Sequence, residues 1–155
     1  MTVLVVAWAR VRTALAALLG AASFVLLTLG YSAAAYLQVL AYDPTLFAVV
    51  GVVVGPLVGI AASWLRGGGE SSWRAATGTA LLSGIGLGEA AYGLTVVSDT
   101  TSPAYWTLIG VVAVALLVAM ILRRIRGVWW ILLAGVGTVA IAGTFVVTYS
   151  RLGGV

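Results

Sequence analysis

The chain contains no cysteine, no histidine and no lysine, and only four of its 155 residues are acidic. Without cysteine, neither a disulfide nor a thiolate metal site can form. Without histidine, the commonest metal ligand and the commonest general base are both missing. The sequence contains no serine–histidine pair, paired carboxylates or metal-ligand cluster. We therefore expect no metal and no cofactor, and the balance of the sequence is against an enzyme.

Charge of either sign is scarce, since 8% of the residues are charged and 63% are hydrophobic. Soluble domains carry about a quarter charged residues. A fold with so little charge could not cover its surface in water, so part of that surface must face lipid. The net charge of +4 comes from arginines that flank apolar segments. This distribution is typical of membrane topology, and we expect no nucleic-acid partner.

Five apolar segments are present, and each offers the roughly 20 residues that cross about 30 Å of hydrocarbon. They cover residues 11–42, 44–65, 73–97, 103–122 and 128–149. Asp43-Pro44 and Ser102-Pro103 each combine a helix N-cap with proline at the first helical position, and Ser71 or Ser72 can cap the third segment. The sequence therefore predicts an all-α fold, an integral membrane bundle of five transmembrane helices that forms one domain over residues 1–155.

The first segment leaves two questions open. A continuous helix over residues 13–42 would be about 45 Å long, so it must tilt, project from the membrane or break near Gly30. Whether residues 31–42 extend the first span therefore stays open. Arg10 and Arg12, an apolar run and then residues 32–35 also mimic a signal peptide. We expect a membrane span, because the apolar run is longer than the hydrophobic region of a usual signal peptide.

The arginines predict the orientation. Seven of the eight lie in alternate connections: Arg10, Arg12, Arg66, Arg74, Arg123, Arg124 and Arg126. The opposite connections carry Asp43 and Asp99. Because arginine-rich connections stay in the cytoplasm, we expect an inside amino terminus and an outside carboxyl terminus. The predicted localisation is the plasma membrane, with membrane lipids as neighbours.

Small residues recur every four positions in the second and third segments. These ridges are Gly51, Gly55, Gly59 and Ser63, followed by Ala76, Ala80, Gly84 and Gly88. Such ridges let a second backbone approach closely, so we predict that the two segments pack as an antiparallel pair. The fifth segment has a softer ridge at Ala134, Thr138 and Ala142. Because small-residue ridges occur on several segments, we expect a homo-oligomer or a partner membrane subunit.

Glu89 is the only acid inside a predicted span. An ionised side chain there costs about 2–3 kcal/mol or more, so it needs a partner or water, and intramembrane acids mark functional sites by default. Tyr92, one turn away, can donate to it. Tyr31, Gln38 and Tyr42 share one side of an extended first helix, at the membrane face expected to lie nearest Glu89.

Together with Trp106, these residues form the predicted ligand-binding site, an aromatic-lined pocket that opens outward. An ordinary belt of interfacial aromatic residues is the alternative explanation for the aromatic members.

Three functions fit these residues. The first is a membrane protein that binds or transports a small amphiphilic or cationic ligand at Glu89. The second is an accessory subunit of a larger membrane complex, held by the small-residue ridges. The third is a membrane enzyme acting on a prenyl or lipid substrate, such as a terpene cyclase, with Glu89 as the acid and aromatic rings that stabilise cations.

Two family resemblances accompany these patterns. Residues 47–59, which contain Gly55-Pro56-Leu57-Val58-Gly59, resemble a stretch in the substrate-binding S components of energy-coupling factor vitamin transporters. That resemblance covers one span, and those proteins have six spans with both ends inside. Residues 54–66 and 73–92 are similar to small uncharacterised multi-pass proteins of actinobacteria, in which a Gly-Pro helix, an arginine loop and a Gly-x-Glu helix follow one another. This second resemblance implies a fold and no established activity.

Overall fold

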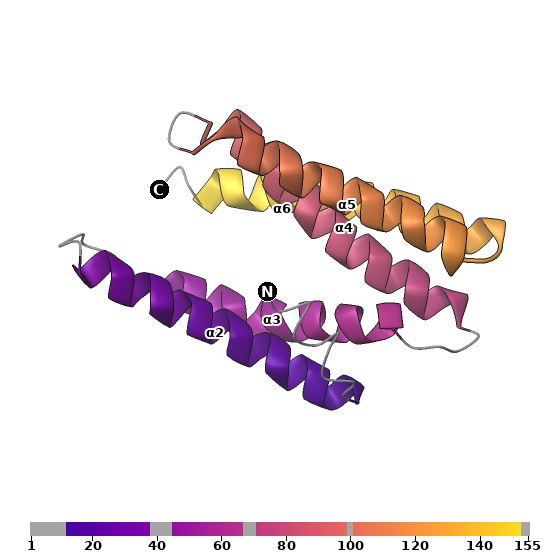
Figure 1. Cartoon of the computed structure of the whole chain (residues 1–155), viewed down its shortest axis with the longest axis horizontal. Coiled ribbons are helices and arrows are strands. Elements are labelled where there is room, and N and C mark those ends of the chain that lie inside the picture. Colours follow the sequence, from indigo (N-terminus) through magenta and orange to yellow (C-terminus); the bar gives the residue numbers. More distant parts are fainter. Residues whose placement is uncertain (1–11, 38–44, 67–70, 99–100, 153–155) are drawn as a thin grey trace. The chain divides into compact units, whose positions relative to one another are not determined.

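The computed structural model describes residues 12–37, 45–66, 71–98 and 101–152, and these residues form five α-helices (Figure 1). The helices are α2 (Thr13–Leu37), α3 (Thr45–Arg66), α4 (Ser72–Thr95), α5 (Pro103–Arg123) and α6 (Val128–Leu152). Their bounds follow the predicted segments closely, and the all-α class is confirmed. α2 continues without a break through Gly30 to Leu37. Its predicted extension toward residue 42 lies outside the described residues.

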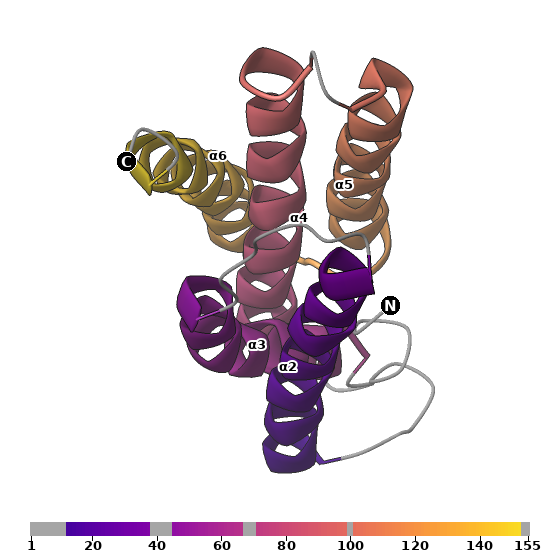
Figure 2. The ribbon, with the colours of Figure 1, turned by 90° about the vertical axis from the view of Figure 1, so that its left-hand side faces the viewer.

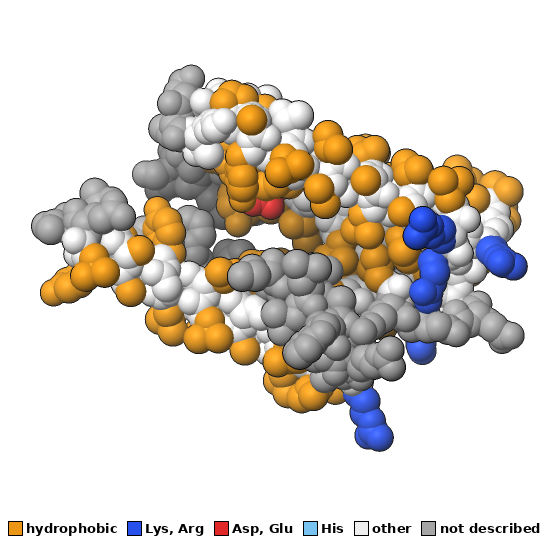
Figure 3. Space-filling model, in the orientation of Figure 1, with side chains coloured by type: hydrophobic (Ala, Val, Ile, Leu, Met, Phe, Trp, Pro, Cys, Tyr) orange, Lys and Arg blue, Asp and Glu red, His pale blue; other side chains and the backbone are white. Residues whose placement is uncertain are grey.

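Three of these helices are long and apolar enough to cross a membrane: Thr13–Leu37, Pro103–Arg123 and Val128–Arg151. Little of each is buried inside the structure, and leucine and valine side chains cover their outer faces, as at Leu26, Val111 and Val139. Figure 3 shows hydrophobic side chains over much of the visible surface. Water would oppose apolar exposure on this scale, whereas hydrocarbon accommodates it. α3 and α4 are not among the three candidate spans.

The chain divides into two compact units, residues 1–67 and 68–155. In the first unit α2 and α3 pack with their backbones in contact. A Cβ placed on Gly55 would lie 2.8 Å from both the carbonyl oxygen of Gly20 and the Cα of Ala21. Gly59 meets Ala16, and Gly51 meets Phe24. The partner number falls as the residue number rises, so the two helices are antiparallel.

In the second unit α4 lies between α5 and α6 (Figure 2). Its contacts with α6 pair Ala80 with Gly137, Gly84 with Thr138 and Ile141, and Gly88 with Ala142 and Phe145. Its contacts with α5 pair Gly86 with Ala113, Ala90 with Gly110, and Gly93 with Trp106. Because α5 and α6 both approach the backbone of α4 closely, α4 needs small residues on the two sides that face them. Those residues make α4 less apolar than a helix that faces lipid.

The small-residue ridges serve as packing surfaces, but with partners that the sequence did not predict. The ridge of α3 meets α2, and the ridge of α4 meets α6. We predicted that the two ridges pack against each other. Instead, each ridge packs against a helix of its own unit. Four-residue spacing predicts close approach of a helix without specifying which helix approaches.

The helix starts fall where the sequence predicts, with a difference in capping. Ser71 and Ser102 are the N-cap residues of α4 and α5, yet neither side chain makes a capping hydrogen bond. Pro103 begins α5. The hydroxyl of Ser72 instead accepts a hydrogen bond from the backbone N–H of Arg126, at 3.4 Å. This bond joins the start of α4 to the α5–α6 hairpin.

Candidate functional site

The Glu89 side chain projects from α4 between the side of the helix that faces α5 and the side that faces α6. Gly88, one residue earlier, faces α6, and Gly93, four residues later, faces α5. Because successive helical residues turn by about 100°, the Glu89 side chain projects between these two contacts. The side chain is half-buried, and it is the only acid in the part of the chain that the structure describes. The acidic atoms visible in Figure 3 lie next to hydrophobic side chains.

Aromatic rings border Glu89 on the α6 side. The Tyr149 ring stacks on Phe145, with centroids 4.3 Å apart, and meets the Tyr92 ring edge-on at 5.7 Å. Phe145 approaches α4 beside Gly88, the residue that precedes Glu89. This approach depends on Gly88, because a Cβ there would lie 2.7 Å from the Cβ of Phe145.

Trp106 borders the same region from α5. Its six-membered ring lies against Gly93, which is one helical turn beyond Glu89. Tyr105 packs edge-on against the indole, with centroids 4.9 Å apart. The indole Nε1–H of Trp106 is buried and has no hydrogen-bond partner among the described residues. Aromatic side chains of α5 and α6 therefore pack against α4 at Gly93 and Gly88, the residues four after and one before Glu89.

The structure brings together three of the six predicted site residues, Glu89, Tyr92 and Trp106, within one unit. Tyr31 belongs to the other unit and is 61% exposed, so its predicted place beside Glu89 stays a prediction. Gln38 and Tyr42 lie outside the described residues. The sequence analysis missed Phe145 and Tyr149. Their four-residue spacing on α6 was the available signal, because it puts both rings on one face.

The chemistry open to this arrangement is that of a weak acid beside aromatic faces and phenol groups. A carboxylate binds cations and hydrogen-bond donors, and aromatic faces add attraction for cations. Among the described residues, no group of three or more histidine, cysteine, aspartate or glutamate side chains could hold a metal ion.

The three long apolar helices indicate an all-helical membrane protein. The chain belongs to a family of unknown function, DUF6518, whose family model matches residues 1–154. Comparison with curated proteins and with solved structures returns no match. The expected uncharacterised family is thus confirmed, whereas the actinobacterial origin and the resemblance to transporter S components stay predictions.

Proposed function

We propose that this protein is a plasma-membrane protein of five spans that binds a small amphiphilic cation at Glu89 and transports it. The observation that carries the proposal is the position of the half-buried Glu89 on α4, between the contact of Gly88 with Phe145 of α6 and the contact of Gly93 with Trp106 of α5. A purely structural helix between two neighbours would need only the small residues that α4 already has.

The positions of the arginines support five crossings. The hydrogen bond between Arg126 and Ser72 brings the start of α4, with Arg74, to the α5–α6 hairpin. Arg151 lies at the opposite end of α6. In the first unit the antiparallel register puts Arg12 at the same end as the end of α3. If the arginine-rich ends face the cytoplasm, the amino terminus is inside and the carboxyl terminus outside.

The energetics favour a cation with an apolar body. An ionised carboxylate within a membrane helix costs about 2–3 kcal/mol or more, and a bound cation offsets that cost. Aromatic faces contribute about 0.5–2 kcal/mol to a cation, with the larger value where water is excluded. Leu82 and Ile85 precede Glu89 on the same side of α4, and both are partly exposed. They would contact the apolar part of the ligand.

Tetraphenylphosphonium is a suitable probe, because it is a cation with an apolar body. We expect the purified wild-type chain to bind it in detergent, and Glu89→Gln to weaken binding at least about tenfold, which corresponds to one charged contact. Thr144→Val is the control within the same unit, since Thr144 is an exposed residue of α6 whose hydroxyl donates a hydrogen bond to the Ala140 carbonyl of its own helix. Tetraphenylborate, a similarly shaped anion, should show no binding that depends on Glu89.

The same probe tests transport. Proteoliposomes with the wild-type chain should take up tetraphenylphosphonium faster than liposomes with the Glu89→Gln variant. Equal binding and equal uptake by a folded Glu89→Gln variant would refute the proposal. Binding that depends on Glu89 without any uptake would restrict the function to binding.

A second candidate function is that of an accessory subunit, and the outer face of α6 favours it. Gly135 and Gly143 are eight residues apart, and a Cβ on either would meet nothing within 4 Å. Open glycines on a membrane helix suit a partner helix. Stoichiometric co-purification of another membrane protein from native membranes, abolished by Gly135→Ile, would favour this function. Purification of the chain alone would count against it.

A further inference from the structure

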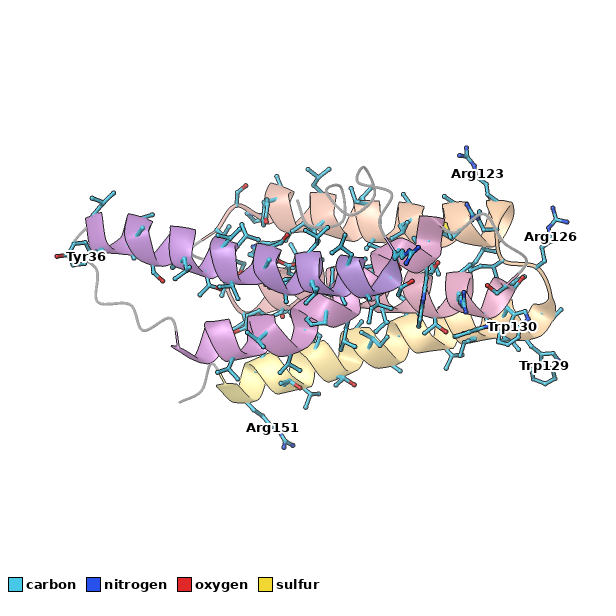
Figure 4. The ribbon with its side chains drawn as sticks, turned by 90° about the horizontal axis from the view of Figure 1, so that it is seen from below. Tyr36, Arg123, Arg126, Trp129, Trp130 and Arg151 are labelled. Carbon is cyan, nitrogen blue, oxygen red and sulfur yellow. The ribbon has the colours of Figure 1, made fainter. Side chains whose placement is uncertain are left out.

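Arginine and tryptophan residues gather at one end of the second unit, where the α5–α6 hairpin meets the start of α4. We call this group the basic end: Trp73, Arg74, Arg123, Arg124, Arg126, Trp129 and Trp130. The hydrogen bond from Arg126 to Ser72 holds its two parts together. Figure 4 shows Arg123, Arg126, Trp129 and Trp130 at this end and Arg151 at the other.

The hairpin directs its arginines outward. Ile125 is only 3% exposed, and its backbone N–H bonds to the carbonyl of Met120 at 2.9 Å. Ile125 points into the unit, whereas Arg123 and Arg126 on either side of it are exposed. Gly127 adopts φ +98°, a conformation that closes the turn and that other residues adopt only with strain.

Large apolar side chains surround these charges. Trp129 is 81% exposed and Leu122 is 79% exposed. The guanidinium of Arg74 lies over the ring of Trp73, 5.3 Å from its centroid. Exposed tryptophan beside arginine is typical of the membrane–water interface, where indole rings lie at the level of the headgroups. The arginines of the basic end would then lie beside lipid phosphates.

We propose that the basic end is a binding site for anionic phospholipid, in which guanidinium groups from two parts of the chain hold phosphate oxygens. An arginine forms two parallel hydrogen bonds to one phosphate. Because α4 and the hairpin both contribute arginines, the site matches a lipid with two phosphates, a diphosphatidylglycerol, better than a lipid with one.

Native mass spectrometry of the full chain in detergent measures this binding directly. We expect affinity to fall from diphosphatidylglycerol to phosphatidylglycerol to phosphatidylcholine. The double variant Arg123→Gln with Arg126→Gln should lose at least about tenfold in affinity for diphosphatidylglycerol, because arginine–phosphate contacts are charge-assisted. Arg151→Gln is the matched control, since it removes one arginine from the opposite end, and it should leave affinity unchanged.

A second variant separates phosphate recognition from net charge. Arg123→Lys with Arg126→Lys keeps the charge but removes the planar fork, so it should bind diphosphatidylglycerol more weakly than wild type and more tightly than the glutamine variant. Equal affinity for phosphatidylcholine, or an equal loss with Arg151→Gln, would overturn the proposal. Soluble glycerol phosphate should not displace the lipid, and displacement at equal concentration would show a free-phosphate site instead.

Discussion

The six-membered ring of Trp106 lies against the Cα of Gly93, where a Cβ would overlap ring atoms Cδ2, Cε2 and Cε3. Only glycine permits this contact, because the ring fills the volume that any side chain at position 93 would need. The contact packs α5 on α4 one turn beyond Glu89. Packing and the candidate site therefore depend on the same residue.

We expect Gly93→Ala to destabilise the protein by about 1–3 kcal/mol, the usual cost of an overpacked contact. Gly135→Ala is the matched control: it lies on α6 with nothing within 4 Å of the added Cβ, and alanine favours a helix over glycine. Thermal unfolding in detergent should show a lower midpoint for the first variant only. Equal midpoints would mean that the indole moves aside at no cost.

The first unit offers a similar comparison. A Cβ on Gly55 would lie 2.8 Å from the Gly20 carbonyl oxygen and from the Ala21 Cα, whereas a Cβ on Gly30 meets nothing within 4 Å. Gly55→Ala should therefore separate α2 from α3 and increase the rate of proteolysis within residues 1–67. Gly30→Ala should not, because its methyl group enters open space. Unchanged proteolysis of the Gly55 variant would contradict the close backbone contact.

The buried hydroxyl group of Ser83 offers a test of stability. Its Oγ is buried without a hydrogen-bond partner among the described residues, so removing it should cost nothing. Ser83→Ala is expected to leave stability unchanged or to raise it by about 1 kcal/mol. The neighbouring Gly84→Ala should destabilise, because its Cβ would lie 2.7 Å from the Ile141 Cβ. A loss with Ser83→Ala would reveal a hydrogen bond to this hydroxyl.

The absence of cysteine makes the proposed topology directly testable. Single substitutions Ser71→Cys, Ser102→Cys and Ser150→Cys place one thiol near an end of α4, α5 or α6. A membrane-impermeant maleimide should label positions 102 and 150 in intact cells, and position 71 only after permeabilisation. Labelling of positions 71 and 102 from the same side would show that α4 does not cross the membrane, and the five-span proposal would fail.

Local sequence was sufficient to predict where the helices begin and end. Ser102-Pro103, the long apolar runs and the charged segment around Arg124 act on neighbouring backbone, so their effect does not depend on distant contacts. Glu89 could also be recognised from the local sequence, because an acidic side chain within an apolar helix costs free energy whichever helix packs against it. Tyr92 was predicted beside Glu89 from its spacing of one helical turn, and Trp106 from its level in the membrane.

Tertiary structure decided which helices meet. A ridge such as Gly84 and Gly88 accepts any helix that presents small groups, so the sequence does not distinguish α3 from α6 as its partner. The aromatic neighbours of Glu89 on α6 follow from that choice, since Phe145 reaches α4 only across Gly88. By itself the sequence determined the helices, their lipid-facing character and the acid among them. The partners of each ridge, and hence the rings around Glu89, depended on contacts between residues far apart in the sequence, from 27 positions for Gly51 and Phe24 to 57 positions for Gly88 and Phe145, which only the folded chain defines.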